Sequence, residues 1–268
     1  MPDPRSRPQF RRGTLAAIEA VSVGLELAER RNGANNISFK DDRDVVTGTD
    51  VAVEDAIRES LSALNLPVVG EERGGEAPAD GSPYWLVDPI CGTRNFASGM
   101  PLYCVNLAFV EGGQVTVAVV GDPSRGEILI AERGRGAWAS KDGVRRRLSV
   151  SDASRTLVIE DGKSKGRPRE HAARFIAEAI RLDRWDFRSL GSTLTLPYMA
   201  AGRVSAYVVF FVPGLHSAAG SLLVTEAGGI VSDIDGQPWT VHADSIVAAA
   251  TPDLHRDLVD LAQATTPR

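Results

Sequence analysis

A run of short apolar segments separated by glycine-rich turns constrains the fold of this chain more than any other feature of its sequence. Glu111-Gly112-Gly113 separates two strand-like segments, residues 103–109 and 114–120. A short turn between two such segments is typical of a β-hairpin. A second hairpin is predicted over residues 127–139. The two hairpins predict a largely antiparallel sheet in the first half of the chain.

Helical periodicity before this sheet, and a change of pattern after it, complete the outline of the fold. Apolar residues at helical spacing predict one helix over residues 15–31 and a second over residues 49–64, with Thr49-Asp50 at its N-terminus. Beyond about residue 151, strands and helices alternate, beginning with a predicted strand at residues 156–160 and a helix at residues 170–180. Alternation of this kind is typical of an α/β arrangement.

The change of pattern divides the chain into three predicted parts. Residues 1–12 are rich in arginine and proline, and we predict a flexible N-terminal tail there. Residues 13–148 are predicted to form an α+β half that carries the metal-binding motifs, and residues 149–268 an α/β half. We expect the functional site between the two halves, because ligands commonly bind at such boundaries.

Composition and charge limit the classes of partner. Hydrophobic residues make up 43% and charged residues 24% of the 268 residues, which argues against a disordered, collagen-like or coiled-coil chain. The net charge is −5 and no basic block is long, so nucleic acid is not an expected partner. Neither a membrane span nor a secretory signal is visible, and the cysteines Cys91 and Cys104 are too few for a disulfide framework. We therefore expect a soluble cytoplasmic protein that does not bind membranes.

The segment from Asp88 to Phe96 is the most informative for chemistry. A predicted strand ends at Asp88, and a proline turn and Gly92-Thr93 follow. This order presents a carboxylate and backbone N–H groups together, which suits a metal ion and a phosphate. Glu71, at the end of the preceding predicted strand, supplies a second carboxylate, and Mg²⁺ commonly binds one or two carboxylates with substrate phosphates. The alternative, that both acids are surface residues at strand ends, stays open on spacing alone.

Beyond this segment, the chain resembles the inositol monophosphatase superfamily, the Mg²⁺-dependent, lithium-sensitive phosphatases of sugar and nucleotide phosphates. The most specific matches are Asp-Pro-Ile-x-Gly-Thr-x-Asn-Phe at residues 88–96 and Glu-Ala-Gly-Gly at residues 226–229. The other matching positions are residues 47–50, Glu54, and residues 70–72, 121–137, 191–192 and 218–239. The resemblance covers residues 13–250, and it implies a layered α/β sandwich with the layer order α-β-α-β-α and a homodimer.

The resemblance also implies roles for individual residues. Glu71, Asp88 and the carbonyl group of Ile90 would form one strong Mg²⁺ site. Asp50 and Thr93 would orient and deprotonate the attacking water, and the Asp50 carboxylate could also cap a helix. The remaining candidates are Glu72, Cys91 and His216 as catalytic residues, and Gly92, Thr93, Lys40, Gly191 and Ser192 as phosphate or substrate ligands.

Two departures from the family pattern alter the second metal site. Cys91 and His216 stand where the family has two aspartates that bind that ion. Four interpretations stay open. The second cation is absent or loosely bound; or Asp88, Cys91 and His216 form a softer ligand set for Zn²⁺ or another transition metal such as Mn²⁺. Alternatively, His216 activates Cys91 as a nucleophile, or the pair is an ordinary buried cysteine and histidine without a role.

These residues predict a metal-dependent phosphomonoesterase that hydrolyses a small phosphorylated metabolite. Inositol monophosphate is disfavoured as the substrate, because Val209 stands where relatives with inositol substrates carry a glutamate. The alternative prediction is a non-phosphatase on the same fold. Such a protein would be either a pseudoenzyme that binds phosphorylated ligands or a repurposed enzyme that uses Cys91 and His216.

Overall fold

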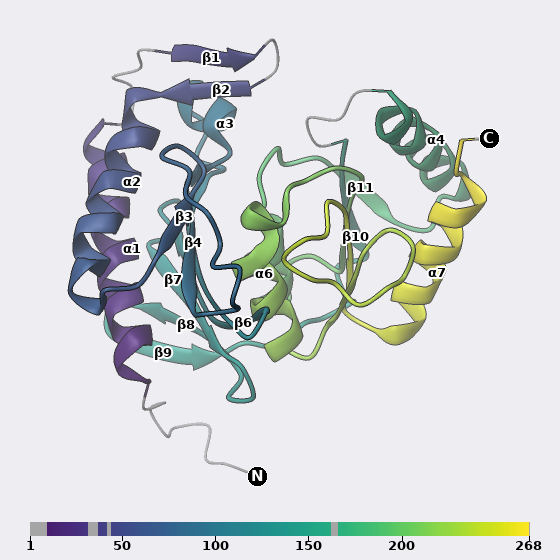
Figure 1. Cartoon of the computed structure of the whole chain (residues 1–268). Helices are drawn as coiled ribbons and strands as arrows, with labels where there is room; N and C mark the ends of the chain where they lie inside the picture. The colour runs from purple at the N-terminus through teal and green to yellow at the C-terminus, as the bar shows by residue number, and fades with distance from the viewer. Residues whose placement is uncertain (1–9, 32–36, 42–43, 162–165, 268) are drawn as a thin grey trace.

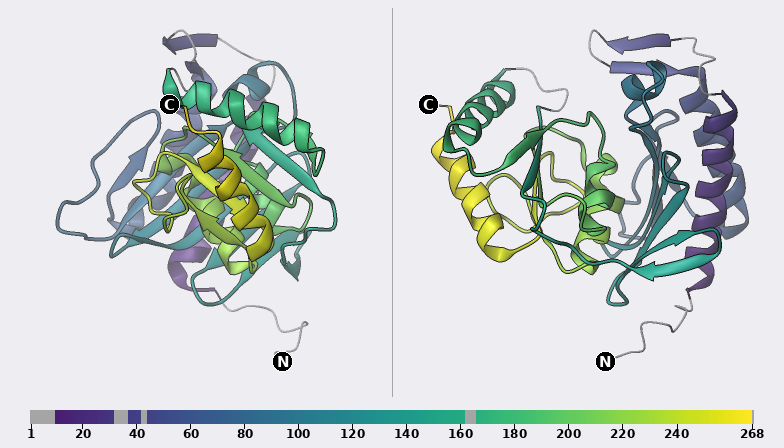
Figure 2. Two further views of the ribbon diagram at one scale, coloured as in Figure 1. Left: turned by 90° about the vertical axis from the view of Figure 1, so that its right-hand side faces the viewer. Right: turned by 180° about the vertical axis from the view of Figure 1, so that it is seen from behind.

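Five layers of secondary structure make up the chain in a computed structural model (Figure 1). The structure describes residues 10–31, 37–41, 44–161 and 166–267, and it describes their side chains except within residues 37–46. From one side to the other, the layers are helices, a large sheet, helices, a small sheet and helices; Figure 2 shows the same order from behind. The predicted layered α/β sandwich is therefore confirmed.

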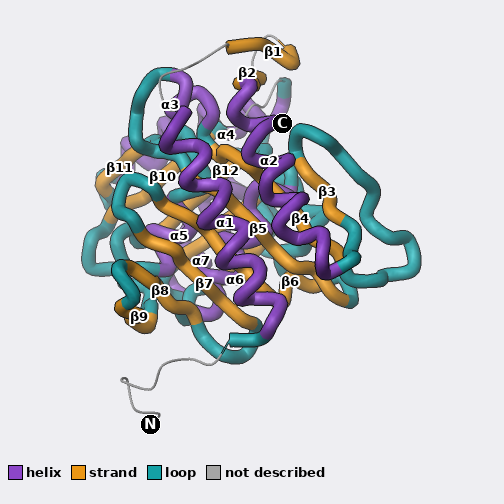
Figure 3. Tube along the Cα trace, turned by 90° about the vertical axis from the view of Figure 1, so that its left-hand side faces the viewer, coloured by secondary structure: helices purple, strands orange, loops and turns teal. Residues whose placement is uncertain are grey.

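The helical layers contain most of the helices in the described part of the chain. The outer pair on one side is α1 (Arg12–Arg31) and α2 (Gly48–Leu61), which Figure 3 shows in front of the large sheet. The middle pair is α5 (Thr195–Ala200) and α6 (Gly214–Glu226), and the outer pair on the other side is α4 (Arg167–Leu182) and α7 (Pro252–Ala264). A short helix α3 (Thr93–Ala97) follows the large sheet's second strand, and a 3₁₀ turn (Ser62–Leu64) follows α2.

The large sheet has seven strands among the described residues. In spatial order they are β3 (Val68–Gly70), β4 (Tyr84–Cys91), β5 (Cys104–Glu111), β6 (Gln114–Asp122), β7 (Glu127–Glu132), β8 (Ala137–Lys141) and β9 (Val144–Arg147). β3 is parallel to β4, and every other neighbouring pair is antiparallel. The two predicted hairpins correspond to β5–β6 and β7–β8, so the prediction of a largely antiparallel sheet is confirmed.

The small sheet has five described strands and mixed pairing. Its spatial order is β11 (Asp186–Arg188), β10 (Thr156–Glu160), β12 (Ala206–Val209), β14 (Ile246–Ala249) and β13 (Ile230–Ser232). β10 is parallel to β11 and β12, whereas β14 is antiparallel to β12 and β13. A separate hairpin of β1 (Ile37–Asp41) and β2 (Asp44–Thr47) precedes α2.

Three hydrophobic cores hold the five layers together. Ile57 of α2 and Ile90 of β4 belong to the core between the outer helices and the large sheet. Leu222 of α6 belongs to the middle core, which fills the space between the two sheets. Phe175 of α4 and Leu258 of α7 belong to the third core, on the outer face of the small sheet. Because α6 packs against both sheets, residues at its N-terminus can reach the ends of strands in the large sheet.

A β-bulge in β4 determines which side chains face the middle core. Side chains alternate between the two faces of a strand, and Leu86 faces the middle core while Val87 faces the outer one. The register against β5 shifts between Asp88 and Cys91. As a result Ile90 packs in the outer core and Cys91 in the middle one. The extra residue thus places Asp88 and Cys91 on the same face of the sheet.

The N-terminus of α2 differs in detail from the prediction. Thr47, and not Thr49 or Asp50, is the N-cap residue, and its side chain accepts hydrogen bonds from the backbone N–H groups of Thr49 and Asp50. Asp50 is the third helical residue and completes a capping box with the backbone of Thr47. The helix therefore begins one residue earlier than predicted.

The predicted N-terminal tail lies mostly outside the described residues. The described part of the chain begins at Phe10, and Arg12 already belongs to α1. None of the described helices combines the length and the apolar character that a membrane span requires.

Candidate active site

Asp88 lies at the centre of the candidate site, near the end of β4, and only 1% of its surface is exposed. Its Oδ2 atom is 2.8 Å from Nδ1 of His216 and 3.4 Å from Nδ2 of Asn106. Its Oδ1 atom is buried and has no hydrogen-bond partner in the described structure. A buried carboxylate oxygen without a partner is costly unless a ligand satisfies it. This oxygen is therefore available to a cation.

His216 lies in the first turn of α6 and contacts two of the predicted metal ligands. Its Nδ1 atom is 2.8 Å from Asp88 Oδ2 and 4.0 Å from Glu71 Oε2. Burial opposes the protonation of His216, but the Asp88 carboxylate outweighs this effect and raises the pKa of the imidazole well above its ordinary value. Burial also opposes the ionisation of Asp88, yet His216 holds the pKa of that carboxyl below its ordinary value. The two side chains form a largely buried ion pair.

Glu54 of α2 holds the turn that carries Glu71 and Glu72. The Glu54 side chain is fully buried, and it accepts hydrogen bonds from the backbone N–H groups of Glu72 at 2.7 Å and Arg73 at 3.1 Å. It also accepts a hydrogen bond from Nε of Arg58 at 2.8 Å. Glu54 is therefore a positioning residue for the carboxylate of Glu71, with Glu72 half-buried in the same turn.

Replacing Glu54 by Gln is expected to loosen this turn. An amide offers one acceptor oxygen in place of two and turns an N–H group toward the donors of the turn, while the partly buried Arg58 loses its counter-charge. We expect the free energy of unfolding to fall by about 2–4 kcal/mol, together with weaker Mg²⁺ binding. Urea unfolding and calorimetric Mg²⁺ titration measure both effects. Glu59→Gln, at an exposed position of the same helix, is the matched control; equal effects in both variants would contradict the role of Glu54.

Asp50 and Thr93 meet beside the carbonyl group of Ile90. The Thr93 hydroxyl lies 3.1 Å from Asp50 Oδ1 and 3.0 Å from the Ile90 oxygen. Asp50 Oδ2 accepts a hydrogen bond from the Thr47 backbone N–H at 2.9 Å, so one carboxylate oxygen caps α2 while the other faces Thr93. Burial raises the pKa of Asp50 above its ordinary value, despite the hydrogen bonds from Thr47 and Thr93. A carboxylate with a raised pKa is a stronger base.

Cys91 is a buried thiol bonded to a loop from the second half of the chain. Its Sγ atom is 2.8 Å from Oγ1 of Thr193 and accepts a hydrogen bond from the Thr193 backbone N–H at 3.4 Å. The neighbouring thiol of Cys104, burial and the charge of Asp88 raise the pKa of Cys91 well above its ordinary value, although a hydrogen bond with His216 acts the other way. A nucleophilic cysteine needs a lowered pKa and some exposure, so this geometry disfavours Cys91 as a nucleophile.

The loop of Gly191 and Ser192 is fixed by hydrogen bonds from two sides. Glu160 Oε1 accepts hydrogen bonds from the backbone N–H of Gly191 at 2.8 Å and of Leu190 at 2.6 Å. The Ser192 hydroxyl donates to the Cys91 carbonyl oxygen at 2.8 Å. Gly92 lies against Ser192 with φ of 98°, and a Cβ atom at Gly92 would come within 3.0 Å of Ser192 Cβ. Glycine is therefore required where the loop meets β4.

Two predicted residues have no described contact with this cluster. Lys40 lies in β1, but its side chain lies outside the described part of the structure. Val209 is buried in β12, directly beside Glu160 of β10. That carboxylate does not replace the glutamate missing at Val209, because its oxygens accept hydrogen bonds from Ser189, Leu190 and Gly191.

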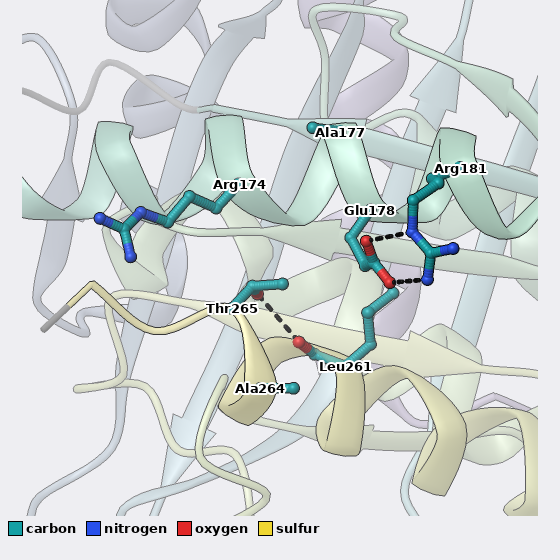
Figure 4. Close-up of a pocket in the computed structure, with 7 residues that line it drawn as sticks. All are labelled: Arg174, Ala177, Glu178, Arg181, Leu261, Ala264 and Thr265. Carbon is teal, nitrogen blue, oxygen red and sulfur yellow. Dashed lines mark hydrogen bonds and ion pairs between the residues drawn. The ribbon is translucent and has the colours of Figure 1, made fainter.

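A depression of about 480 Å³ between α4 and α7 lies away from this cluster (Figure 4). Its charged and polar side chains bond to the protein itself. Arg181 pairs with Glu178 at 2.5 Å, Arg174 pairs with Glu170 at 2.6 Å, and the Thr265 hydroxyl donates to the Leu261 carbonyl oxygen at 2.8 Å. We assign no ligand to this depression.

The cluster around Asp88 combines the parts that metal-assisted hydrolysis requires. The Glu71 and Asp88 carboxylates both lie near His216. Five residues after Asp88, the Thr93 hydroxyl contacts the Ile90 carbonyl oxygen and the buried Asp50 carboxylate, whose pKa is raised. A model of the inositol monophosphatase family matches residues 11–266 of the chain. The chain belongs to the inositol monophosphatase family. The predicted family resemblance is thus confirmed.

Relatives within the inositol monophosphatase family carry two kinds of name. The inositol-1-monophosphatase of Mesorhizobium japonicum is 36% identical over 240 residues, which cover 85% of this chain and 88% of that protein. The Nus factor SuhB of Escherichia coli K12 is 38% identical over 217 residues, which cover 79% of this chain and 80% of that protein. Family membership therefore supports a phosphatase without naming the substrate.

Solved structures of the inositol monophosphatase family share the layered fold. The extragenic suppressor protein SuhB from Bartonella henselae superimposes with a TM-score of 0.83 and 26% identity, covering 93% of this chain and 97% of that one. The IMPase from Thermotoga maritima superimposes with a TM-score of 0.80 and 28% identity, covering 92% of this chain and 95% of that one.

Several residues of the site carried no predicted role in the sequence. Glu54 matches the family pattern, but nothing in its local sequence indicates that it holds the turn of Glu71. Asn106, Thr193 and Glu160 join the site only through contacts between elements far apart in the chain. A polar residue in an otherwise apolar strand is the only available signal, and Asn106 in β5 provides it.

Proposed function

We propose that the chain is a metal-dependent phosphomonoesterase that hydrolyses a small phosphorylated metabolite. The observation that carries this proposal is the buried Oδ1 atom of Asp88, which has no hydrogen-bond partner among the described residues. Glu71 Oε2 and Asp88 Oδ2 both lie within 4.0 Å of the same atom, Nδ1 of His216, so the two carboxylates are close together.

The ligand set of Glu71, Asp88 and the Ile90 carbonyl group fits Mg²⁺. All three donors are oxygen atoms, and Mg²⁺ prefers oxygen ligands and keeps positions for water and substrate phosphate. When bound, such a cation neutralises phosphate charge and lowers the pKa of nearby water. The partly exposed side chains of Glu71 and His216, at 14% and 18%, leave a path from solvent.

The chain's own residues activate the water in this proposal. The Thr93 hydroxyl donates its proton to a hydrogen bond with Asp50. The Thr93 oxygen can therefore accept a hydrogen bond from the attacking water. Asp50 takes up a proton of that water through Thr93, and the raised pKa of Asp50 favours this transfer. The backbone N–H groups at the start of α3, at Gly92 and Thr93, face no partner within the helix and suit a phosphate oxygen.

Replacing Thr93 by Val is expected to lower kcat by about 100-fold with little change in KM. Valine keeps the shape of threonine but removes the hydroxyl that links Asp50 to the Ile90 carbonyl group. Steady-state phosphate release measures kcat and KM separately. Thr93→Ser retains the hydroxyl and should keep most of the activity. An unchanged kcat in Thr93→Val would contradict the proposed proton transfer through Thr93.

Inositol monophosphate is disfavoured as the substrate in this proposal. Val209 is buried in β12 and offers no polar atom to a ring hydroxyl, and the adjacent Glu160 bonds to the loop of Gly191. Gly191 and Ser192 shape the wall of the site through that loop. Sugar, nucleotide and other alcohol phosphates remain the candidate substrates.

Phosphate release from a substrate panel tests the proposed function. The protein is stripped of metal with chelator and incubated with sugar, nucleotide, alkyl and inositol phosphates, with Mg²⁺, Mn²⁺ or Zn²⁺ added separately. Metal-dependent release from at least one compound other than inositol monophosphate is the expected result. If a folded protein released phosphate from none of these compounds, the proposal would be refuted.

A second candidate function follows from the relatives called Nus factor SuhB. Cys91 and His216 replace two aspartates of the family pattern. This replacement favours a protein that uses the fold without hydrolysing phosphate esters. In that case no compound of the panel would release phosphate, while the protein would still bind Mg²⁺ or inorganic phosphate. Calorimetric titration with each of these ligands separates this outcome from an inactive preparation.

A further inference from the structure

We propose that Asp88, Cys91 and His216 form a site for Zn²⁺ or a similar transition-metal ion in the position of the family's second Mg²⁺ site. Each residue offers one ligand atom, and the three atoms lie within 4.8 Å of one another. The three residues come from two distant segments, the bulged end of β4 and the first turn of α6. The inference deepens the proposed function and rests on it for the identity of the neighbouring Mg²⁺ site.

The donor set does not suit Mg²⁺ at this position. Mg²⁺ requires oxygen ligands in near-octahedral geometry, whereas a thiolate and an imidazole are typical ligands of Zn²⁺, Co²⁺ and related ions. Three protein ligands leave a fourth position open, which is the arrangement of catalytic and not structural zinc sites. A phosphate oxygen or water can therefore reach an ion held by these residues.

The spacing of one pair of ligand atoms, in His216 and Asp88, is close to what a tetrahedral ion requires. Bonds of 2.0–2.2 Å from zinc to nitrogen and oxygen place the two ligand atoms roughly 3.3 Å apart. The observed separation between His216 Nδ1 and Asp88 Oδ2 is 2.8 Å, so a small outward movement suffices. His216 lies in the first turn of α6.

The Cys91 sulfur is held in place by contacts with Thr193. Asn106 Nδ2 donates to Thr193 Oγ1 at 3.2 Å, which leaves the hydroxyl proton of Thr193 free to point at Cys91 Sγ, 2.8 Å away. The Thr193 backbone N–H donates to the same sulfur at 3.4 Å. Outer contacts of this kind commonly orient metal ligands.

The second buried cysteine provides an internal control. Cys104 lies directly opposite Cys91 in the β4–β5 register and is fully buried. It is not part of the cluster of ligand atoms around Asp88. Binding of a metal ion through a thiolate should therefore require Cys91 and should not require Cys104.

Titration with Co²⁺ tests the inference by spectroscopy instead of phosphate release. Chelator-treated protein is saturated with Mg²⁺, to fill the oxygen site, and is then titrated with Co²⁺. We expect a near-ultraviolet band of thiolate-to-cobalt charge transfer and intense visible bands of four-coordinate cobalt. One equivalent of Zn²⁺ should remove both sets of bands, whereas further Mg²⁺ should leave them unchanged. Wild-type protein without the charge-transfer band, or a band abolished by Mg²⁺, would overturn the inference.

Three variants locate the bound ion. Cys91→Ser should lose the charge-transfer band, and His216→Gln should weaken Co²⁺ binding by at least about 10-fold. Cys104→Ser should keep the full spectrum. If Cys104→Ser lost the charge-transfer band while Cys91→Ser kept it, the ion would be bound elsewhere and the proposed site would be refuted. Far-ultraviolet circular dichroism checks that each variant is folded. Because the readout is a spectrum, the inference can fail while phosphate release persists, and the reverse can also occur.

Discussion

Replacing Asp88 by Asn is expected to abolish metal-dependent phosphate release, with a loss of at least about 100-fold in kcat. The amide removes the negative charge that binds the cation and leaves His216 without its counter-ion. Added Mg²⁺ should no longer restore activity, because an uncharged amide is a poor Mg²⁺ ligand. Initial rates across a Mg²⁺ titration measure the effect.

The matched control for this variant is Asp142→Asn. Asp142 is exposed in the turn between β8 and β9 with φ of 50°, a conformation that asparagine tolerates well. Its activity and thermal stability should equal those of the wild-type protein. If Asp88→Asn kept substantial Mg²⁺-dependent activity with a normal circular dichroism spectrum, Asp88 would not be a metal ligand.

Restoring aspartate at both Cys91 and His216 is expected to raise Mg²⁺-dependent activity by about 10-fold or more. The double variant supplies two hard oxygen ligands next to Asp88, so a second Mg²⁺ can bind beside the first. Without metal, three adjacent buried carboxylates repel one another and destabilise the protein. Mg²⁺ should therefore increase the melting temperature of the double variant more than that of the wild-type protein.

The single variants decide whether the two positions act as one site. Cys91→Asp alone and His216→Asp alone should each gain less than the double variant, because one added ligand leaves the second ion weakly held. Activity is measured at a series of Mg²⁺ concentrations, with differential scanning calorimetry in parallel. A double variant that is folded and binds extra Mg²⁺ but shows no gain in rate would contradict the expectation that a second Mg²⁺ at this position raises activity.

Most of the fold was accessible from local sequence patterns. The hairpins of the large sheet follow turns such as Glu111-Gly112-Gly113, where short-range geometry dictates antiparallel pairing. The start of α2 was less accessible, because Thr47, Thr49 and Asp50 are all good capping residues. The structure selects Thr47, since Asp50 then closes the capping box and still reaches Thr93.

The sequence motifs identified the chemistry of the site but not its full membership. Asp88 and Thr93 stand in the string at residues 88–96, and Asp50 stands in the separate matching segment of residues 47–50. The resemblance implied that Asp50 and Thr93 act together, and the Thr93 hydroxyl contacts the Asp50 carboxylate in the structure. Glu160 and Thr193 lie in ordinary sequence contexts and have no motif. Glu160 meets Gly191 because β10 and β11 are neighbouring strands of the small sheet. Thr193 meets Cys91 because the loop that carries Thr193 contacts the end of β4 in the large sheet.

Local periodicity and turn chemistry were sufficient to predict helices α1, α2 and α4 and the hairpins of the large sheet, since those signals act over a few residues. The motif strings at residues 88–96 and 226–229 carried the resemblance to the family. The meeting of Cys91 and His216 around Asp88 was not specified in that way. It depends on a single extra residue in β4, which turns Cys91 toward the middle core, and on the packing of α6 against the sheet, which brings His216 within 2.8 Å of Asp88. A shift of one position in a strand reverses the face of every following side chain, and packing alone selects the position of that shift.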